Sequence, residues 1–267
     1  MSEFETINVR RRGGAATIEL FRPESMNAWN RQFGLDLRAA IEQVAEDDSV
    51  RAVCITGAGR AFSSGADLKD LGSREDVTPQ GRPDVHKALT ERYHPIITGV
   101  RTMPKPVVAA VNGPAVGIGL SLALAADLVV AKESAYFLLA FVNIGLAPDG
   151  GSSLFVPERV GFTRAAEMAM LGEKIGAAQA AEWGLINRAI PDAAFDAEVE
   201  ALVDRLANGA TAAHAGIKRQ LNAWLFDRME GQLALEAGVQ QDMAHSDDFV
   251  EGITAFVEKR PARFQGR

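Results

Sequence analysis

Residues 53–68 are Val-Cys-Ile-Thr-Gly-Ala-Gly-Arg-Ala-Phe-Ser-Ser-Gly-Ala-Asp-Leu, and residues 105–119 are Lys-Pro-Val-Val-Ala-Ala-Val-Asn-Gly-Pro-Ala-Val-Gly-Ile-Gly. In each stretch an apolar run typical of a buried strand leads into a glycine-rich turn. A turn of this kind presents backbone N–H groups at the start of a helix, where the helix dipole favours negative charge. On spacing alone, two such turns fit either an oxyanion-binding site or the close packing of two backbones, because glycine serves both.

Two other kinds of site fit the first turn less well. The third glycine of a dinucleotide-binding fingerprint would fall on Phe62, and no Gly-Lys-Ser/Thr follows as a P-loop requires. A serine nucleophile elbow needs Gly-x-Ser-x-Gly, whereas this chain has Ala61-Phe-Ser-Ser-Gly65. None of the four histidines lies in a motif that marks it as a catalytic partner or a metal ligand.

The remaining sequence predicts alternating strands and helices followed by helices alone. Apolar residues at strand or helix spacing support each element. The predicted elements are strands at 17–20, 50–56, 107–111 and 128–131, helices at 30–47, 84–101 and 117–126, a turn-rich segment at 145–153, and helices from residue 195 onward. This order indicates an α/β fold with a helical C-terminal layer.

The composition and the charge pattern limit the partners and the location that can be expected for the chain. The chain has 267 residues, 47% hydrophobic residues and a net charge of -7, with its basic residues scattered, so nucleic acid is not expected to bind. The one cysteine, Cys54, lies in a predicted strand, and residues 1–12 lack the pattern of a signal peptide, so we expect a reducing, cytoplasmic location. Residues 107–126 carry no charge, but a buried strand entering a buried helix explains them better than a membrane span. We expect Trp29, Trp183 and Trp224 in the core.

Four segments in chain order resemble the enoyl-CoA hydratase/isomerase (crotonase) superfamily. They are the two stretches quoted above, Phe21-Arg-Pro-Glu-Ser-Met-Asn-Ala28 and Phe256-Val-Glu-Lys259, and they span nearly the whole chain. The resemblance implies a crotonase-like spiral of ββα units over residues 1–194. It also implies a C-terminal helical region over residues 195–267 that builds a homotrimer or a dimer of trimers.

By position, the resemblance implies an acyl-CoA thioester substrate whose carbonyl oxygen is held by the N–H groups of Ala66 and Ile118. The family usually has glycine where Ile118 stands; the backbone donor survives this change, and the side chain narrows the acyl pocket. The CoA site would be lined by Ala28, Ala66, Asp67, Leu68 and Lys69, while Phe256 and Lys259 fall where a neighbouring subunit often adds contacts. Coenzyme A is part of the substrate, and no separate cofactor or metal is expected.

The acid–base positions bear on the reaction. Family hydratases activate water with two glutamates, which align here with Ser121 and Phe141. Neither side chain can act as a carboxylate base near neutral pH, so hydration in the usual way is disfavoured. Residues 140–153 instead resemble the segment of Δ3,Δ2-enoyl-CoA isomerases and of ring-opening isomerases of phenylacetyl-CoA breakdown. Their single catalytic acid aligns with Asp149.

From the residues alone, Pro148-Asp-Gly-Gly151 is also ordinary turn chemistry. If Asp149 is the base, we expect apolar neighbours such as Phe141, Leu146 and Phe155 to disfavour its charged form. The favoured function is an acyl-CoA isomerase that shifts a double bond through a dienolate. The alternatives are a hydratase on an unusual acyl-CoA, with Asp149 and Ser121 holding water, a catalytically silent acyl-CoA binder, and a thioesterase.

Overall fold

The main sheet of the computed structural model, which describes residues 4–69 and 77–267, has six strands. Their spatial order is β1-β2-β3-β4-β6-β9; β1 runs antiparallel to β2, and the remaining neighbours are parallel. The bounds are Ile7–Arg12 (β1), Ala15–Leu20 (β2), Ala52–Gly57 (β3), Val107–Val111 (β4), Leu128–Lys132 (β6) and Arg188–Ile190 (β9).

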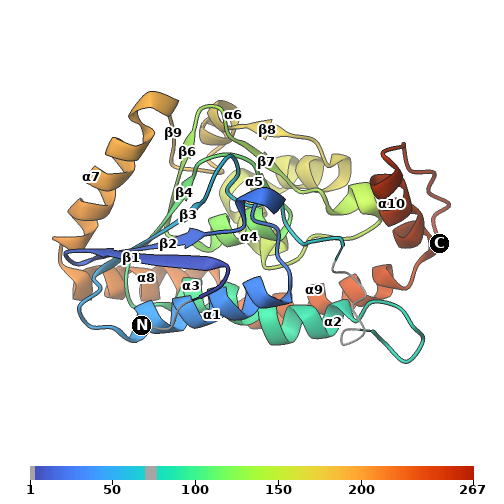
Figure 1. The fold of residues 1–267 in the computed structure, drawn as a ribbon, viewed down its shortest axis with the longest axis horizontal. Coiled ribbons are helices and arrows are strands. Elements are labelled where there is room, and N and C mark those ends of the chain that lie inside the picture. Colours follow the sequence, from blue (N-terminus) through green and yellow to red (C-terminus); the bar gives the residue numbers. More distant parts are fainter. Residues whose placement is uncertain (1–3, 70–76) are drawn as a thin grey trace.

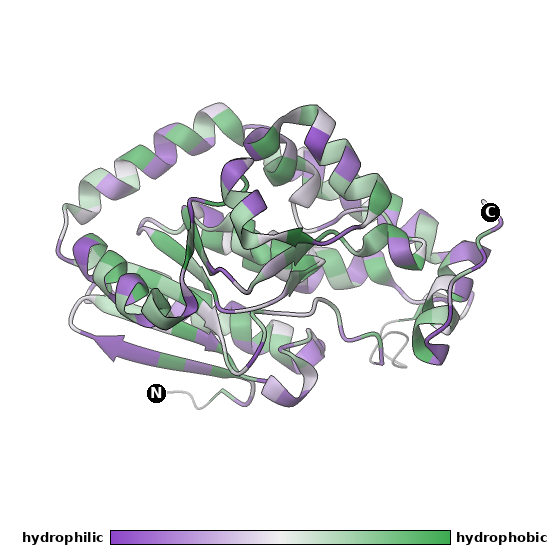
Figure 2. Ribbon diagram, turned by 90° about the horizontal axis from the view of Figure 1, so that it is seen from above, coloured by the Kyte–Doolittle hydropathy of each residue, from purple (hydrophilic) through white to green (hydrophobic). Residues whose placement is uncertain are grey.

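Both faces of this sheet are covered, which explains why its central strands are continuous apolar runs. Successive side chains point to opposite faces: Val53 and Ile55 enter the main core, while Cys54 faces helix α7 (Phe195–Ala207). Figure 2 shows the central strands largely in the hydrophobic colour, whereas the strand nearest the N-terminus is largely hydrophilic.

A small second sheet, in the order β5-β7-β8, begins within the second glycine-rich turn. Its strands are β5 (Ala115–Val116), β7 (Tyr136–Leu138) and β8 (Ile175–Gly176). The short β5 pairs with β7 and is followed at once by helix α4 (Ile118–Ala125), all of whose residues are buried. The uncharged stretch 107–126 is therefore a strand, a turn and a buried helix. Within residues 4–69 and 77–267, no helix is long and apolar enough to cross a membrane.

Helices pack around the two sheets (Figure 1). The helix predicted at 84–101 is observed as α2 (Val85–Ala88), a π-helical turn η2 (Leu89–Tyr93) and α3 (His94–Thr102). The other helical elements are η1 (Pro23–Ser25), α1 (Arg31–Glu46), η3 (Phe141–Ile144), α5 (Ser152–Leu171), α6 (Ala177–Glu182), η4 (Asp192–Ala194), α8 (Thr211–Leu225), α9 (Met229–Ala244) and α10 (Asp247–Glu258). The prediction of helices after residue 195 is confirmed.

One core prediction is wrong. Trp29 is buried and Trp183 is partly buried, but the side chain of Trp224 on α8 is 83% exposed in the single chain. An aromatic residue favours burial in general, yet its place on a helix decides whether its own chain can cover it.

Candidate active site

The two glycine-rich turns pack directly against each other. The N–H groups of Phe62 and Ser63 donate to the carbonyl of Pro114 at 3.1 and 3.0 Å, and the N–H of Val116 donates to the carbonyl of Ser63 at 2.9 Å. A Cβ atom at Gly119 would lie 2.8 Å from the Ser63 carbonyl oxygen, so this approach requires glycine. These glycines therefore allow the two backbones to pack closely, which is the simpler of the two roles that the sequence left open.

Asn27 fixes the first turn from within. Its amide nitrogen donates to the carbonyls of Ala58, Ala61 and Phe62 at 3.0, 2.9 and 3.2 Å, and its amide oxygen accepts from the N–H of Arg22 at 2.9 Å. The side chain is fully buried, and an apolar replacement would remove all four hydrogen bonds and leave the Ala58 and Phe62 carbonyls without this donor. Through Asn27, the segment 21–28 therefore holds the turn that carries Ala66 in place by hydrogen bonds.

Close packing leaves two backbone donors free. Within the described part of the chain, the N–H groups of Ala66 and Ile118 have no hydrogen-bond partner, whereas their neighbour Asp67 donates to Trp29 at 3.0 Å. Ile118 is the first residue of α4, and the glycine before it has a φ of 54°. Such orphan donors at a helix start suit an anionic oxygen.

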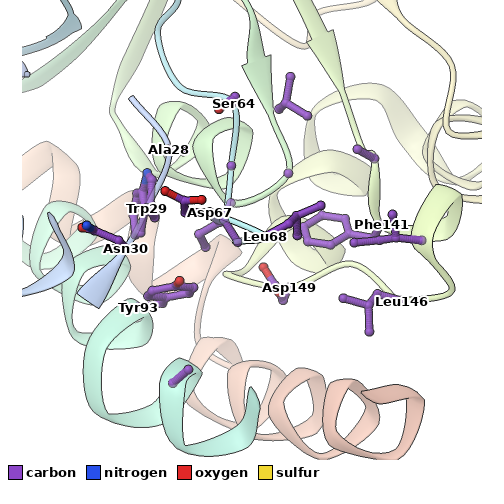
Figure 3. A pocket seen from close by; sticks show the side chains of 18 of the residues that line it. Ala28, Trp29, Asn30, Ser64, Asp67, Leu68, Tyr93, Phe141, Leu146 and Asp149 are labelled. Atoms are coloured by element: carbon purple, nitrogen blue, oxygen red, sulfur yellow. The ribbon is translucent and has the colours of Figure 1, made fainter. Parts of the chain in front are cut away.

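A cavity of about 780 Å³ lies beside both donors (Figure 3). Of the residues implied by the resemblance, Lys259 is exposed at the end of α10 and does not line it. Those that line it are Ala28, Ala66, Asp67, Leu68, Lys69, Ile118, Asp149 and Phe256. Phe256 reaches the cavity from α10 of its own chain. A cavity of this size, whose lining surface is mostly apolar, suits a small organic ligand.

Asp149 is a buried acid in this cavity. Its side chain is 6% exposed, and its Oδ2 atom accepts a hydrogen bond of 2.6 Å from the amide of Gln240 on α9. Its Oδ1 atom is buried and has no partner among the described residues. Figure 3 shows the carboxyl group directed toward the space between Leu68 and Tyr93. One oxygen is held by a hydrogen bond, and the other is buried without one.

The surroundings of Asp149 favour its protonated form. Burial raises the pKa of Asp149 to about 8, the Gln240 hydrogen bond opposes this rise, and the charge of Glu236 adds to it. Phe141 and Leu146 line the cavity with Asp149, whereas Phe155 packs one turn further on, against Gly151 and Phe226. Burial therefore disfavours the charged form, and of the three expected apolar neighbours Phe141 and Leu146 share the cavity with Asp149 while Phe155 does not.

Sequence reasoning missed three polar residues on α9 that hold the Asp149 loop. Gln232, Glu236 and Gln240 are spaced by four, so they share one helix face. Glu236 accepts from the N–H groups of Gly151 and Ser153 at 2.7 and 3.1 Å and thereby caps α5, while Gln232 donates to the Ser153 hydroxyl at 2.7 Å. The four-residue spacing was the available signal, but it is equally typical of a solvated helix face.

Ser121 and Phe141, the two positions aligned with hydratase glutamates, do not form an acid–base pair. Ser121 is fully buried, its hydroxyl donates to the Asp149 carbonyl at 2.8 Å, and it is not among the described residues that line the cavity. Phe141 lines the cavity with a phenyl ring. Neither places a carboxylate near the two free N–H groups. Among the described residues, no cluster of His, Cys, Asp or Glu is suited to a metal ion.

Comparison with known proteins identifies the family. Residues 10–267 match the family model described as enoyl-CoA hydratase/isomerase. The chain is 44% identical, over 99% of both sequences, to a probable enoyl-CoA hydratase of Rhodobacter capsulatus. It is 37% identical, over the full length of both, to 1,2-epoxyphenylacetyl-CoA isomerase of Escherichia coli. A crystal structure of an enoyl-CoA hydratase from Mycobacterium avium subsp. paratuberculosis has a TM-score of 0.89 at 37% identity, covering 98% of this chain and 100% of that one.

The fold and the paired turns define an enzyme of the crotonase type. The chain belongs to the enoyl-CoA hydratase/isomerase family.

Proposed function

We propose that this enzyme is an acyl-CoA isomerase that moves a carbon–carbon double bond. Asp149, as a carboxylate, removes a proton from the carbon between the thioester carbonyl and a 3,4 double bond. The electron pair enters the conjugated system and the thioester oxygen becomes a dienolate oxygen, which the N–H groups of Ala66 and Ile118 bind. Protonated Asp149 then returns the proton to the fourth carbon, and the double bond lies between the second and third.

The observation that carries this proposal is the burial of one acid. Asp149 is the single buried carboxyl among the described residues that line the cavity, and its second carboxyl oxygen has no partner there. A pKa of about 8 suits a group that must both accept and return a proton near neutral pH. One such group suffices for proton transfer between two carbons.

The test is an isomerase assay with a 3-enoyl-CoA substrate, following formation of the conjugated 2-enoyl product. We expect Asp149→Asn to lower kcat by about 10²- to 10⁴-fold, because the amide has no basic oxygen of comparable strength. Asparagine keeps an oxygen that accepts from Gln240, so the loop should fold normally. Full activity of this variant would remove Asp149 from the mechanism.

Asp84→Asn is a matched control. Asp84 also lines the cavity, but its carboxylate caps α2 by accepting from the N–H of Lys87 at 2.9 Å. Asparagine caps helices equally well, so this variant should retain its activity. A loss equal to that of Asp149→Asn would show that the assay responds to charge in the cavity rather than to one base.

A second candidate is a hydratase, which the name of the Rhodobacter capsulatus relative favours. In that case Asp149 would activate water for addition to a 2-enoyl-CoA. Oxygen-18 from labelled water would then appear in a 3-hydroxyacyl product, whereas isomerisation incorporates none. The two candidates are separated by running both substrates in labelled water with the same preparation.

We also propose that the chains associate as trimers or dimers of trimers. Helices α5 and α8 carry large apolar side chains that are exposed in the single chain, including Phe162 and Met170 on α5 and Leu221 and Trp224 on α8. Exposed apolar side chains of this size favour burial against another chain. Light scattering should give three or six times the chain mass of 28.6 kDa, and a monomer mass would contradict the proposal.

A further inference from the structure

One face of α9 contacts both Asp149, the proposed base, and the start of α5, the helix that follows Asp149 in the chain. Gln232 binds the Ser153 hydroxyl, Glu236 binds the N–H groups of Gly151 and Ser153 at the start of α5, and Gln240 binds the carboxyl of Asp149. Glu236 and Gln240 are buried, at 3% and 0% exposure. Buried polar groups that are fully bonded hold their partners in one arrangement.

The orientation of the Gln240 amide is fixed from its other end. Its oxygen accepts from the N–H of Ala147 at 3.3 Å, so its nitrogen faces Asp149. An amide nitrogen can only donate, and it donates to Oδ2 of Asp149 at 2.6 Å. The backbone carbonyl of Asp149 is held separately, by the hydroxyls of Ser121 and Ser152 at 2.8 and 2.7 Å.

We propose that Gln240 is a positioning residue that holds the Asp149 carboxyl in one orientation, with Oδ2 occupied and Oδ1 left to exchange the substrate proton. This inference rests on the proposed function. Gln240 does not touch the reacting carbons in this account; it acts through Asp149. By donating to the carboxylate it also favours the ionised form, which is the form that removes the proton.

The other charged groups at the site come from several elements. Glu236, on the same helix, raises the pKa of Asp149 through its charge. Among the described residues, the other titratable groups that line the cavity are Arg22 before η1, Glu24 of η1, Arg31 of α1, Asp67 and Lys69 after the first turn, Asp84 before α2, Arg92 and Tyr93 of η2, and Tyr136 of β7. The side-chain hydrogen bond to the Asp149 carboxyl comes from Gln240, which carries no charge.

The test is Gln240→Met, which keeps the length of the side chain and removes the donor. A hydrogen bond to a charged group is worth about one pKa unit or more, so the pKa of Asp149 should rise by about one unit. The acidic limb of the kcat/KM profile should move to higher pH by the same amount, giving a roughly tenfold loss at pH 7 and a smaller loss above pH 9. Carbon-13 NMR of carboxyl-labelled aspartate, assigned with Asp149→Asn, measures the same pKa without any turnover.

Gln232→Met is the matched control, because Gln232 lies on the same face but binds Ser153 rather than Asp149. It should leave the Asp149 pKa and the pH profile unmoved. An equal shift in both variants, or no shift in Gln240→Met, would overturn the proposal. If Gln240→Met does not fold, Gln240→Asn, which withdraws the amide by one methylene, should give the same shift, and an unmoved pKa there would also overturn it.

Failure of this inference and failure of the proposed function give different results. Full isomerase activity in Asp149→Asn would reject the function, whatever Gln240 does. An unmoved Asp149 pKa in Gln240→Met, together with an inactive Asp149→Asn, would reject only the role of Gln240.

Discussion

The hydroxyl of Ser121 donates a hydrogen bond of 2.8 Å to the backbone carbonyl of Asp149. Ser121 lies on α4, which begins with the free N–H of Ile118, so one short helix carries both an oxyanion donor and a support for the base. Where the resemblance places a glutamate in hydratases, this chain has a side chain that binds backbone. The substitution changes the residue from a reacting group into a structural one in this fold.

Ser121→Ala should therefore weaken the site without abolishing it. The Asp149 carbonyl keeps its bond from Ser152, so the free energy of unfolding should fall by only about 1 kcal/mol. We expect kcat to fall about 3- to 10-fold because the base is held less firmly. Urea denaturation and steady-state kinetics measure the two effects. Ser134→Ala, which removes an exposed hydroxyl bound to Asp192, should leave kcat unchanged, and a loss of kcat there would discredit the comparison.

The activity should rise with pH through the neutral range. Because burial raises the pKa of Asp149 to about 8, most of the free enzyme carries a protonated acid at pH 7. The carboxylate is the reactive form, so kcat/KM should increase roughly tenfold per pH unit below about pH 8 and level off above it. A profile measured from pH 5.5 to 9.5 checks this. A flat profile across that range would mean that another group removes the proton.

The stability should change with pH in the opposite direction. The pKa of Asp149 is about 8 in the folded chain against an ordinary value of 3.8, so between these values the unfolded chain releases a proton that the folded chain keeps. The free energy of unfolding should thus fall as pH rises from about 4 to about 8, and then become constant. Asp149→Asn should remove this loss, so its stability relative to the wild type should rise by about 4 kcal/mol between pH 5 and pH 9. Equal stability differences at both pH values would contradict the raised pKa.

The sequence predicted most of the main sheet and the C-terminal helices because their apolar spacing reports burial directly. The strand β1 was missed, since its outer half is Arg10, Arg11 and Arg12 and only its pairing with β2 makes it a strand. Gln240 was missed for a similar reason. Its partner Asp149 lies 91 residues earlier in the chain, and no local pattern distinguishes a buried glutamine from a solvated one.

Gly117→Ala should disturb one oxyanion donor and little else. Gly117 has φ 54° and ψ -127°, a conformation that disfavours any side chain, but an added Cβ would find only ordinary contact with Phe141 at 3.8 Å. The strain of about 1–3 kcal/mol should be relieved by a shift of the adjoining Ile118 N–H. We expect kcat to fall at least tenfold while KM changes less. Gly13→Ala, at a left-handed position with nothing within 4 Å, controls for strain alone and should leave kcat unchanged.

Gly150→Ala should show that the side chain of Ile118 and the Asp149 loop share one space. Gly150 has φ +61°, and an added Cβ would lie 2.2 Å from Cδ1 of Ile118, so the variant should lose about 2–4 kcal/mol of stability and most of its activity. Valine at position 118 lacks that Cδ1 atom and keeps the backbone N–H. The double variant Gly150→Ala/Ile118→Val should therefore be more stable than the sum of the two single effects predicts, which a double-mutant cycle in urea measures. Strict additivity would show that the cost of Gly150→Ala is backbone strain alone, and that Ile118 does not set the space beside the base.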